Sequence, residues 1–520
     1  MKGGSFFLDN SDEASVGRLR QLTTHDREDV ADAYKGRKKG PNKHSFIPLI
    51  AIVIFCLFYM LPIYENYPTA HSCLAILILG AVLWGTETIP SYITAYLMPL
   101  LCVWFAIGYD DNTGKRIPSN RMAVIISAKF TDPIIFVFLG SMTMSAALTK
   151  LKITERVSTY ALSRISKKPS VVLFALMLLN FTTAAFLSNI ASTTLALSFS
   201  LPIIRDLDPD DNFIKALLFG LAWSGNAGGM PTTISSSQNI LAIKFINESG
   251  RTAISFIEWL SFAGPIGTVC LIFFWAFLKI KFPCNKDYLE IKAPKIGQNN
   301  EKWTWKHNFT CIITGTTILM WALQESFPAF LGHVGITSLL PIVSLFSSKI
   351  LDSEDFGKLR WSTLSLMGGG LALGEAMKVS GLLDLLASTI LNLLRGISLW
   401  VVMMLFLVVQ SVLVSIINHT SAAAILYPVL NSIGEELGKP NLVLTLSAMI
   451  IGCAQLFHIS SFPNALISGV QRHSQKDHSH LEQEPFLPGS SFFTVGWPSV
   501  LGSVIIIGTF GYFLVLLLGF

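Results

Sequence analysis

Small polar residues and glycines occur where the flanking sequence is continuously apolar, and such residues can bind ions inside a membrane. The first stretch is Ser188-Asn189-Ile190, and a second runs from Gly225 to Asn239 as GNAGGMPTTISSSQN. Irregular backbone is tolerated within a bilayer only where protein buries it or where it lines a cavity. We therefore interpret this part of the chain as a binding site formed by broken helices.

The same polar stretches recur in the second half of the chain, in the same order. Ser188-Asn189-Ile190 corresponds to Asn418-His419-Thr420, 230 positions later. SSSQN, which ends at Asn239, corresponds to SSFPN, which ends at Asn464, 225 positions later. Matched interrupted segments in two halves of a chain are the best sequence indication of a transporter binding site.

Two glycine-containing runs complete the repeat, FLGSMTMSAAL from Phe138 and LMGGGLALGEA from Leu366, which lie 228 positions apart. Each half would then hold one hairpin, one broken helix and one polar loop. An odd number of membrane crossings per half would make the two repeats inverted, as in many secondary transporters.

Broken helices suit charged cargo, because helix ends inside the membrane expose free backbone groups. Free N–H groups carry partial positive charge and favour an anion, whereas carbonyl, hydroxyl and amide oxygens favour a hard cation such as sodium. The candidate substrate ligands are Ser188, Asn189, Ile190, Asn418, His419 and Thr420. The candidate cation ligands are Ser188, Asn189, Gly225, Gly228, Gly229, Asn239, Asn418, Ser461 and Asn464.

Neither three-residue motif contains lysine or arginine. An anion bound there would meet only dipoles and neutral donors, and burying unneutralised charge is costly. Co-bound cations would offset that cost, so the motifs favour cation-coupled symport over anion exchange. His419 can titrate near neutral pH, which leaves proton coupling open beside sodium. The alternative interpretation is that serine, asparagine and glycine only pack membrane helices together.

Two carboxylates beside apolar segments, Glu87 and Glu375, are further functional candidates. For Glu87 a role at a helix end is the favoured alternative. The loop 471–489 contains three histidines that could hold a metal, but a solvated surface loop is the favoured interpretation.

The composition is that of a polytopic membrane protein. Of the 520 residues, 51% are hydrophobic and 14% are charged, and the mean hydropathy is +0.55. Soluble proteins carry about 25% charged residues. The net charge of +5 comes from basic residues near helix ends and does not indicate nucleic-acid binding. Seven cysteines without CxxC spacing argue against a disulfide framework and a zinc site.

The sequence does not favour an enzyme or a receptor. The apolar segments hold no HExxH motif and no convincing nucleophile–base set, and a receptor would not need a duplicated broken-helix site. No cofactor and no transition metal are therefore expected, only a coupling ion.

Apolar segments long enough to span a bilayer, about 20 residues each, recur along the chain. About 11 transmembrane helices are expected, near 45–64, 70–90, 91–108, 170–189, 212–230, 256–281, 308–326, 334–350, 399–417, 441–459 and 492–519. Shorter apolar pieces are interpreted as re-entrant hairpins or half-helices, near 122–150, 190–205, 361–378 and 420–437. The expected fold class is an all-α polytopic membrane protein with two inverted repeats.

These patterns divide the chain into four parts. Residues 1–44 are predicted to be a disordered cytosolic tail without a cleavable signal peptide, and residues 45–282 a first membrane repeat with a leading helix. Residues 283–306 form a predicted cytosolic linker and residues 307–520 a second membrane repeat. Basic clusters in the tail and in the linker place both in the cytosol by the positive-inside rule.

The paired motifs resemble the signature of the divalent anion:sodium symporter family, which is a Ser-Asn-Thr motif in each repeat. Here the motifs are Ser-Asn-Ile and Asn-His-Thr, and these departures resemble the branch that contains the yeast low-affinity phosphate transporters. WGTETIPSYITAYLMPLL (Trp84 to Leu101), GNAGGMPTTISSSQNI and SSFPN are also similar to that branch. The resemblance spans roughly residues 45–520. The large N-terminal regulatory domain of those yeast proteins has no counterpart in the 44-residue tail.

The resemblance implies a homodimer in a lipid bilayer, in which a mobile transport domain moves like an elevator against a scaffold. It places sodium sites around the first motif with the loop from Gly225 to Asn239, and around the second motif with His458 to Asn464. The expected function is symport of inorganic phosphate with sodium or protons. The alternative substrate is a dicarboxylate, citrate or sulfate, and Ile190 in place of threonine favours phosphate. The expected location is the plasma membrane or a vacuolar or other endomembrane.

Overall fold

The computed structural model describes residues 47–520 except 62, 111–113, 163–165, 188, 249–253, 290–301, 325, 459 and 474–482. The predicted tail, Ser188, half of the linker and residues 474–482 of the histidine-containing loop therefore lie outside the described residues. Strands in the described part form only two short antiparallel hairpins, β1 (Tyr109–Asp110) with β2 (Lys115–Arg116) and β3 (Gln471–His473) with β4 (Gln483–Pro485). Helices make up most of the remainder, so the all-α prediction is confirmed.

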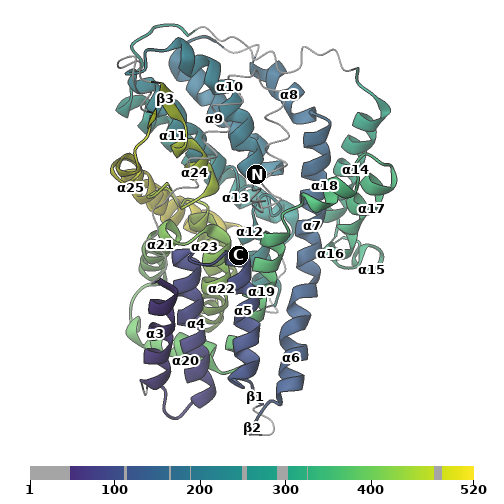
Figure 1. The fold of residues 1–520 in the computed structure, drawn as a ribbon, viewed down its shortest axis with the longest axis vertical. Coiled ribbons are helices and arrows are strands. Elements are labelled where there is room, and N and C mark those ends of the chain that lie inside the picture. The colour runs from purple at the N-terminus through teal and green to yellow at the C-terminus, as the bar shows by residue number, and fades with distance from the viewer. Residues whose placement is uncertain are drawn as a thin grey trace, which may run out of the picture.

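The helices of the first half occupy both ends of an elongated molecule (Figure 1). They are α3 (Ile47–Met60), α4 (Pro68–Thr86), α5 (Ser91–Trp104), α6 (Ser119–Ser127), η3 (Ala128–Thr131), α7 (Pro133–Lys150), α8 (Ile153–Leu162), α9 (Pro169–Phe186), α10 (Asn189–Asp206), α11 (Asn212–Ala227), α12 (Ser237–Glu248) and α13 (Phe256–Lys281). In Figure 1 the helices α3 to α6 extend to the lower end, and α8 to α11 lie at the upper end.

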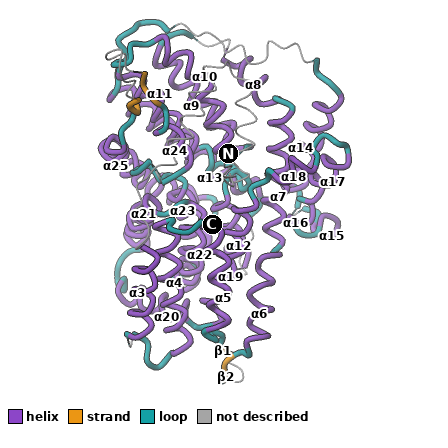
Figure 2. The backbone as a smooth tube through the Cα atoms, in the orientation of Figure 1, coloured by secondary structure: helices purple, strands orange, loops and turns teal. Residues whose placement is uncertain are grey.

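The helices of the second half begin with a group of short segments on one flank (Figures 1 and 2). These are α14 (Trp305–Ala322), α15 (Pro328–Leu331), α16 (Val334–Thr337), α17 (Leu339–Ser347) and α18 (Ser353–Gly357). The remainder are α19 (Trp361–Val379), α20 (Leu382–Leu393), α21 (Leu399–Ile416), α22 (His419–Glu436), α23 (Pro440–Ile451), α24 (Phe462–Ser468), α25 (Gly489–Ile506), η4 (Ile507–Gly511) and α26 (Tyr512–Leu517).

Fewer helices than expected are long and apolar enough to cross a membrane by themselves. Within the described residues six pass that test, at Pro68–Thr86, Ser119–Lys150, Pro169–Phe186, Phe256–Lys281, Leu399–Ile416 and Gly489–Leu517. The pair α19 and α20 would be a seventh span, bent by 77°. The expected count of 11 is not confirmed, because α3, α5 and α23 are short apolar helices of 14, 14 and 12 residues. The stretch 122–150 belongs to a 32-residue span and is not a short half-helix.

Both predicted helix breaks are present, and they are built alike. Helices α9 and α10 have 18 residues each, as do α21 and α22, and each of the second pair begins 230 positions after its counterpart. The chain is extended between the helices, with φ −110° and ψ −178° at Leu187 and φ −105° and ψ 142° at Ile417. Asn418 then caps α22, since its Oδ1 accepts a hydrogen bond from the Ser421 backbone N–H at 3.0 Å.

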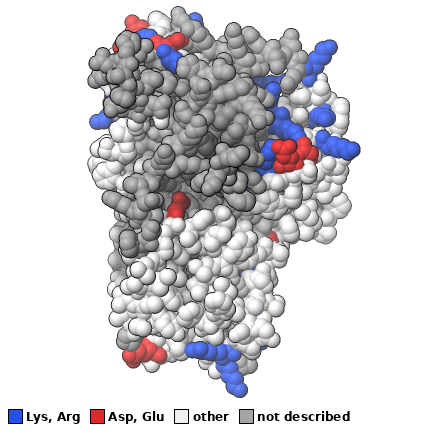
Figure 3. All heavy atoms as spheres, in the orientation of Figure 1, with Lys and Arg blue, Asp and Glu red and all other residues white. Residues whose placement is uncertain are grey.

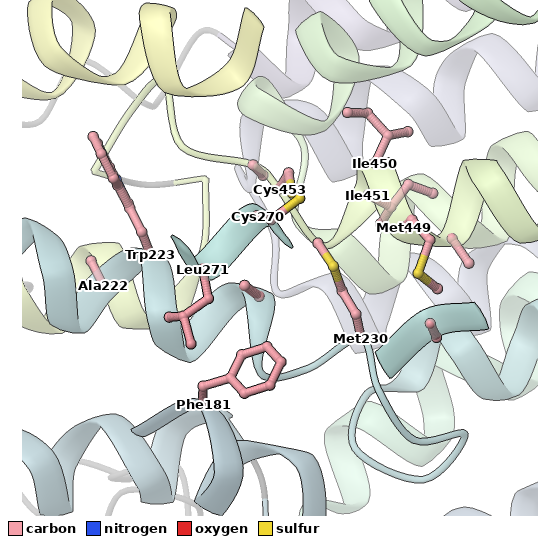
Figure 4. Close-up of a cluster of buried hydrophobic side chains, with 14 of the residues drawn as sticks. Phe181, Ala222, Trp223, Met230, Cys270, Leu271, Met449, Ile450, Ile451 and Cys453 are labelled. Carbon is pink, nitrogen blue, oxygen red and sulfur yellow. The ribbon is translucent and has the colours of Figure 1, made fainter. Parts of the chain in front are cut away.

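The two halves of the chain interlock around these breaks. Helix α12 of the first half packs against α22 of the second, and α24 of the second half packs against α10 and α11 of the first. Buried side chains between α9, α11, α13 and α23 form part of the largest apolar core (Figure 4), among them Phe181, Ala222, Trp223, Met230, Cys270, Leu271, Met449, Ile450, Ile451 and Cys453. The helix that follows each polar loop, α12 or α24, therefore packs against helices of the other half of the chain.

The described charged side chains on the face in Figure 3 gather mainly at the two ends and on one flank, and most of the described surface in the lower half of the view carries no charge. On the flank, Lys150 at the end of α7 donates to Asp352, which caps α18, at 3.0 Å. The hydrogen bond from Lys150 lowers the pKa of Asp352 to about 2. This distribution is typical of a protein whose middle faces lipid.

Glycines of α19 allow close contact with three different neighbours. A Cβ atom on Gly368 would meet the Phe130 ring, one on Gly370 would meet Ala424 of α22, and one on Gly369 would lie 2.6 Å from the Cα of Ala95 in α5. Small residues allow membrane helices to approach in this way. The run LMGGGLALGEA is thus a packing surface, and the packing interpretation is correct for these glycines.

Gly369→Ala should lower the unfolding temperature of the detergent-purified protein, because the backbone of Ala95 cannot move away from the new methyl group. Overpacking of this kind costs about 1–3 kcal/mol. Gly315→Ala in α14 is the matched control, since no atom lies within 4 Å of a Cβ there and alanine favours a helix. Equal unfolding temperatures for the two variants would contradict the close α5–α19 contact.

Candidate functional site

The two motifs meet at a single cavity of about 450 Å³. Asn189 and Ile190 of the first motif line it, together with Asn418, His419 and Thr420 of the second. These five residues are all half-buried. The structure therefore brings together every described residue that the sequence predicted as a substrate ligand, across 230 positions of chain.

Five helices of twelve or more residues direct their N-termini at this cavity. Its wall includes the first residues or caps of α5 (Ser91), α10 (Asn189), α12 (Ser237), α19 (Arg360) and α22 (Asn418). The N-terminus of a helix carries about half a positive charge and unpaired N–H groups. Five such ends around one space make a strongly anion-attracting site.

Hydrogen bonds connect the motifs to the polar loop of the first half. The Ser236 hydroxyl donates to Asn189 Oδ1 at 3.3 Å, and the hydroxyls of Ser237 and Thr420 are hydrogen-bonded to each other. The second of these bonds joins α12 to α22 and so joins the two repeats. His419 Nε2 is buried, and the described residues offer it no hydrogen-bond partner.

The cavity wall carries one acidic side chain among its lining residues. Glu87 caps the C-terminus of α4 with a left-handed backbone at φ 46°, and its Oε1 accepts a hydrogen bond from Asn418 Nδ2 at 3.3 Å. Glu87 therefore has the helix-end role that was favoured for it, and it also lines the cavity. Glu375 forms an ion pair with Lys129 at 3.0 Å and does not line the cavity.

The predicted cation ligands separate into two groups. Asn189, Asn418 and Ser461 line the cavity, whereas Gly225, Gly228, Gly229, Asn239 and Asn464 lie behind its wall. Gly225 and Gly228 are packing positions, because a Cβ there would overlap Thr193 and the backbone of Phe181 respectively.

Two asparagines, one in each half, hold the polar loops with equivalent hydrogen bonds to backbone carbonyls. Asn239 Nδ2 donates to the carbonyls of Gly229 and Thr232, both at 2.8 Å. Asn464 Nδ2 donates to the carbonyls of Ala454 and Phe457 at 3.2 and 3.0 Å. All three positions of the second loop follow those of the first by 225 residues, so the repeat extends to single hydrogen bonds.

Sequence reasoning missed three residues near the site. Arg360 and Gln238 line the cavity, and Asn226 joins the two loops by donating to Asn464 Oδ1 at 3.1 Å. The observation that neither motif contains a basic residue remains correct, but the cavity they form does contain one. Arg360 escaped notice because it stands 58 positions before Asn418, at the start of a separate helix. Gln238 was visible within SSSQN as a buried polar residue beside the motifs.

The site offers no cluster of metal-binding side chains. In the part of the chain that the structure describes, no three His, Cys, Asp or Glu residues come together in a way that could hold a metal ion. The groups present at the cavity are N–H donors, hydroxyls, amides, one arginine and one carboxylate, which suit an oxyanion.

Comparison with known proteins agrees with this chemistry. The family model described as citrate transporter (CitMHS) matches residues 80–452 and, in a second match, residues 333–519. An uncharacterized transporter of Schizosaccharomyces pombe is 31% identical over 471 residues, which are 90% of this chain and 52% of that protein. The inorganic phosphate transporter PHO87 of Saccharomyces cerevisiae is 29% identical over 450 residues, 86% of this chain and 47% of that protein. This chain spans about half the length of these fungal relatives.

A bacterial relative is matched over most of its length. The sodium-dependent dicarboxylate transporter SdcS of Staphylococcus saprophyticus is 24% identical over 480 residues, 84% of this chain and 88% of that protein. Among solved structures, the YdaH transporter of Alcanivorax borkumensis has a similar fold, with a TM-score of 0.53 at 12% identity over 82% of this chain and 98% of that one. The family match covers both broken helices and more than half of the chain, and the chain therefore belongs to the citrate transporter family.

Proposed function

We propose that this transporter moves inorganic phosphate, or a related divalent anion, by symport with a cation. The observation that carries the proposal is the meeting of five helix N-termini at one cavity, because that arrangement favours an anion over a cation. Relatives named as phosphate transporters, PHO87 and the low-affinity phosphate transporter PHO90, support phosphate as the substrate.

A dicarboxylate or citrate is the second candidate substrate, and sulfate is a third. The SdcS relatives are named as dicarboxylate transporters, and the family model is named for citrate. A cavity of about 450 Å³ is within the usual size range of small-molecule sites and has room for either anion. The apolar Ile190 removes one hydroxyl donor from the wall, which favours the smaller anion.

Sodium and protons are both candidate coupling ions. Asn226 Oδ1 and Asn239 Oδ1 are buried oxygens without a hydrogen-bond partner among the described residues, and a hard cation prefers oxygen ligands. His419 Nε2 is the corresponding free group for proton coupling. Sodium-dependent relatives favour sodium.

The proposed transport movement is of the elevator type, in a homodimer. The helices that carry the site interlock across the repeats, α12 with α22 and α24 with α10 and α11, so they would move as one body. Such a body could carry the cavity past a dimeric scaffold while the contacts that form the cavity wall stay intact. The proposed location is the plasma membrane or an endomembrane, with the N-terminus in the cytosol.

Proteoliposomes containing the purified protein should accumulate labelled phosphate when a sodium or proton gradient is imposed. Unlabelled phosphate should compete at lower concentration than succinate, citrate or sulfate, because phosphate places its charge in one compact group. Uptake that does not change with either gradient would refute symport. Stronger competition by succinate would identify a dicarboxylate transporter.

Asn189→Ala and Thr420→Ala should each reduce phosphate uptake at least about tenfold, since a hydrogen bond to a charged group is worth roughly 1.5–3 kcal/mol. Thr182→Ala is a suitable control, because its exposed hydroxyl in α9 bonds only to carbonyls of its own helix. Dimer content and unfolding temperature, measured in detergent, would separate lost binding from lost folding. Normal uptake by both site variants would return these residues to a packing role.

A further inference from the structure

The guanidinium of Arg360 is held at the cavity wall by an aromatic ring. Arg360 caps α19, and its Cζ lies 5.6 Å from the ring centroid of Phe138, a residue of α7 that is only 2% exposed. Both residues line the cavity. A guanidinium stacked on a ring face keeps its five N–H donors free at its edge. The ring therefore orients the group while leaving its hydrogen-bonding capacity unused.

No carboxylate neutralises Arg360 within the described part of the chain. Other partly buried basic residues do have acidic partners: Lys129 pairs with Glu375 at 3.0 Å, and Lys244 pairs with Asp132 at 2.6 Å. Arg360 has no ion pair and no side-chain hydrogen bond to any described residue. A half-buried charge without a counter-ion is unfavourable, so an anionic ligand is the partner that this position lacks.

Gln238 supplies a second unused donor on the same wall. It is 2% exposed and lies in the first turn of α12, and its Nε2 has no hydrogen-bond partner among the described residues. An unpaired buried amide N–H costs about 1–3 kcal/mol, so such groups normally have a partner. A bound oxyanion would accept this hydrogen bond.

We propose that Arg360 and Gln238 bind the transported anion directly and make the site selective for a tetrahedral dianion. This inference rests on the proposed function. Arg360 donates two parallel N–H groups to two oxygens of the anion, and Gln238 donates one N–H to a third oxygen. A single arginine among converging helix ends concentrates positive charge at one point. A compact dianion such as HPO₄²⁻ matches that point, whereas a dicarboxylate separates its two charges.

The internal repeat shows that Arg360 has no basic counterpart in the first half of the chain. The position 228 residues before Arg360 is Asp132, which caps α7 and pairs with Lys244. The same offset relates Phe138 to Leu366, and both of those line the cavity. Equivalent positions therefore line the cavity in both halves of the chain, but only the second half has an arginine at the start of its helix.

Labelled phosphate uptake should be measured for the wild type, Arg360→Gln and Arg360→Lys over a range of phosphate concentrations. Arg360→Gln should raise KM on the order of 10- to 100-fold, as expected for a lost charge-assisted hydrogen bond. Arg360→Lys should give an intermediate KM, because a point charge cannot form the two parallel bonds. Gln238→Leu, which removes the free donor, should raise KM by a smaller factor.

The pH profile gives a readout that a structural role would not change. Wild-type KM for total phosphate should fall as pH rises through the second ionisation of phosphate, and Arg360→Gln should lose most of this dependence. Arg121→Gln is the control, because its side chain is 67% exposed and lies outside the cavity. Unchanged KM and pH profile in Arg360→Gln would overturn the inference.

The outcomes separate this inference from the proposed function. Wild-type protein that transports none of the tested anions would refute the function itself. Wild-type phosphate uptake with unaltered KM in the Arg360 variants would refute only the role of Arg360. If Arg360→Gln does not fold, Arg360→Lys decides, and a wild-type KM there would overturn the proposal. Stabilisation by added phosphate against heat, measured in detergent, should follow the same order as KM.

Discussion

The architecture depends on one constraint, which is that backbone groups at membrane depth must find partners. Two helices are nevertheless interrupted, at Leu187 and at Ile417, and each interruption leaves the N–H groups of a new helix without intrahelical partners. Asn418 satisfies one of them at α22, and the first residues of both α10 and α22 line the cavity. The breaks are tolerated because both line the same cavity between the two repeats.

Polar contacts connect the two repeats around this cavity. Ser237 is bonded to Thr420, and Asn226 is bonded to Asn464, so each half holds a group of the other. Within the loops, the amides of Asn239 and Asn464 hold equivalent carbonyls. Breaking one of these buried hydrogen bonds would leave a further unpaired group in a low-dielectric interior, which favours a single arrangement of the loops. This constraint explains how irregular loops can form a defined binding site.

The sequence predicted the repeat and the breaks, but not the whole wall of the site. Asn189 and Asn418 were identifiable because polar residues interrupt apolar segments at a constant spacing. Arg360 was not, since its repeat counterpart Asp132 has the opposite charge, so a search for matched residues passes over it. The expected number of spanning helices was not confirmed for a related reason. Hydropathy records apolar character, but α5 and α23 have only 14 and 12 residues, and α23 is apolar because protein surrounds it.

The charges on the cavity wall suggest a reason why an anion carrier of this kind would transport cations together with its substrate. Arg360 and Glu87 line the described cavity with formal charges that sum to zero, although no ion pair joins them, so a bound dianion would give the site a net charge of about −2. Moving one charge across a membrane potential of ~100 mV costs about 2.3 kcal/mol. Inward transport of a dianion against a negative interior would therefore be opposed unless cations travel with it. The two asparagine-bracketed loops, one in each repeat, are suitably placed to hold them. Arg360 would therefore contribute to binding of the anion, but it would not remove the charge that opposes transport of the anion.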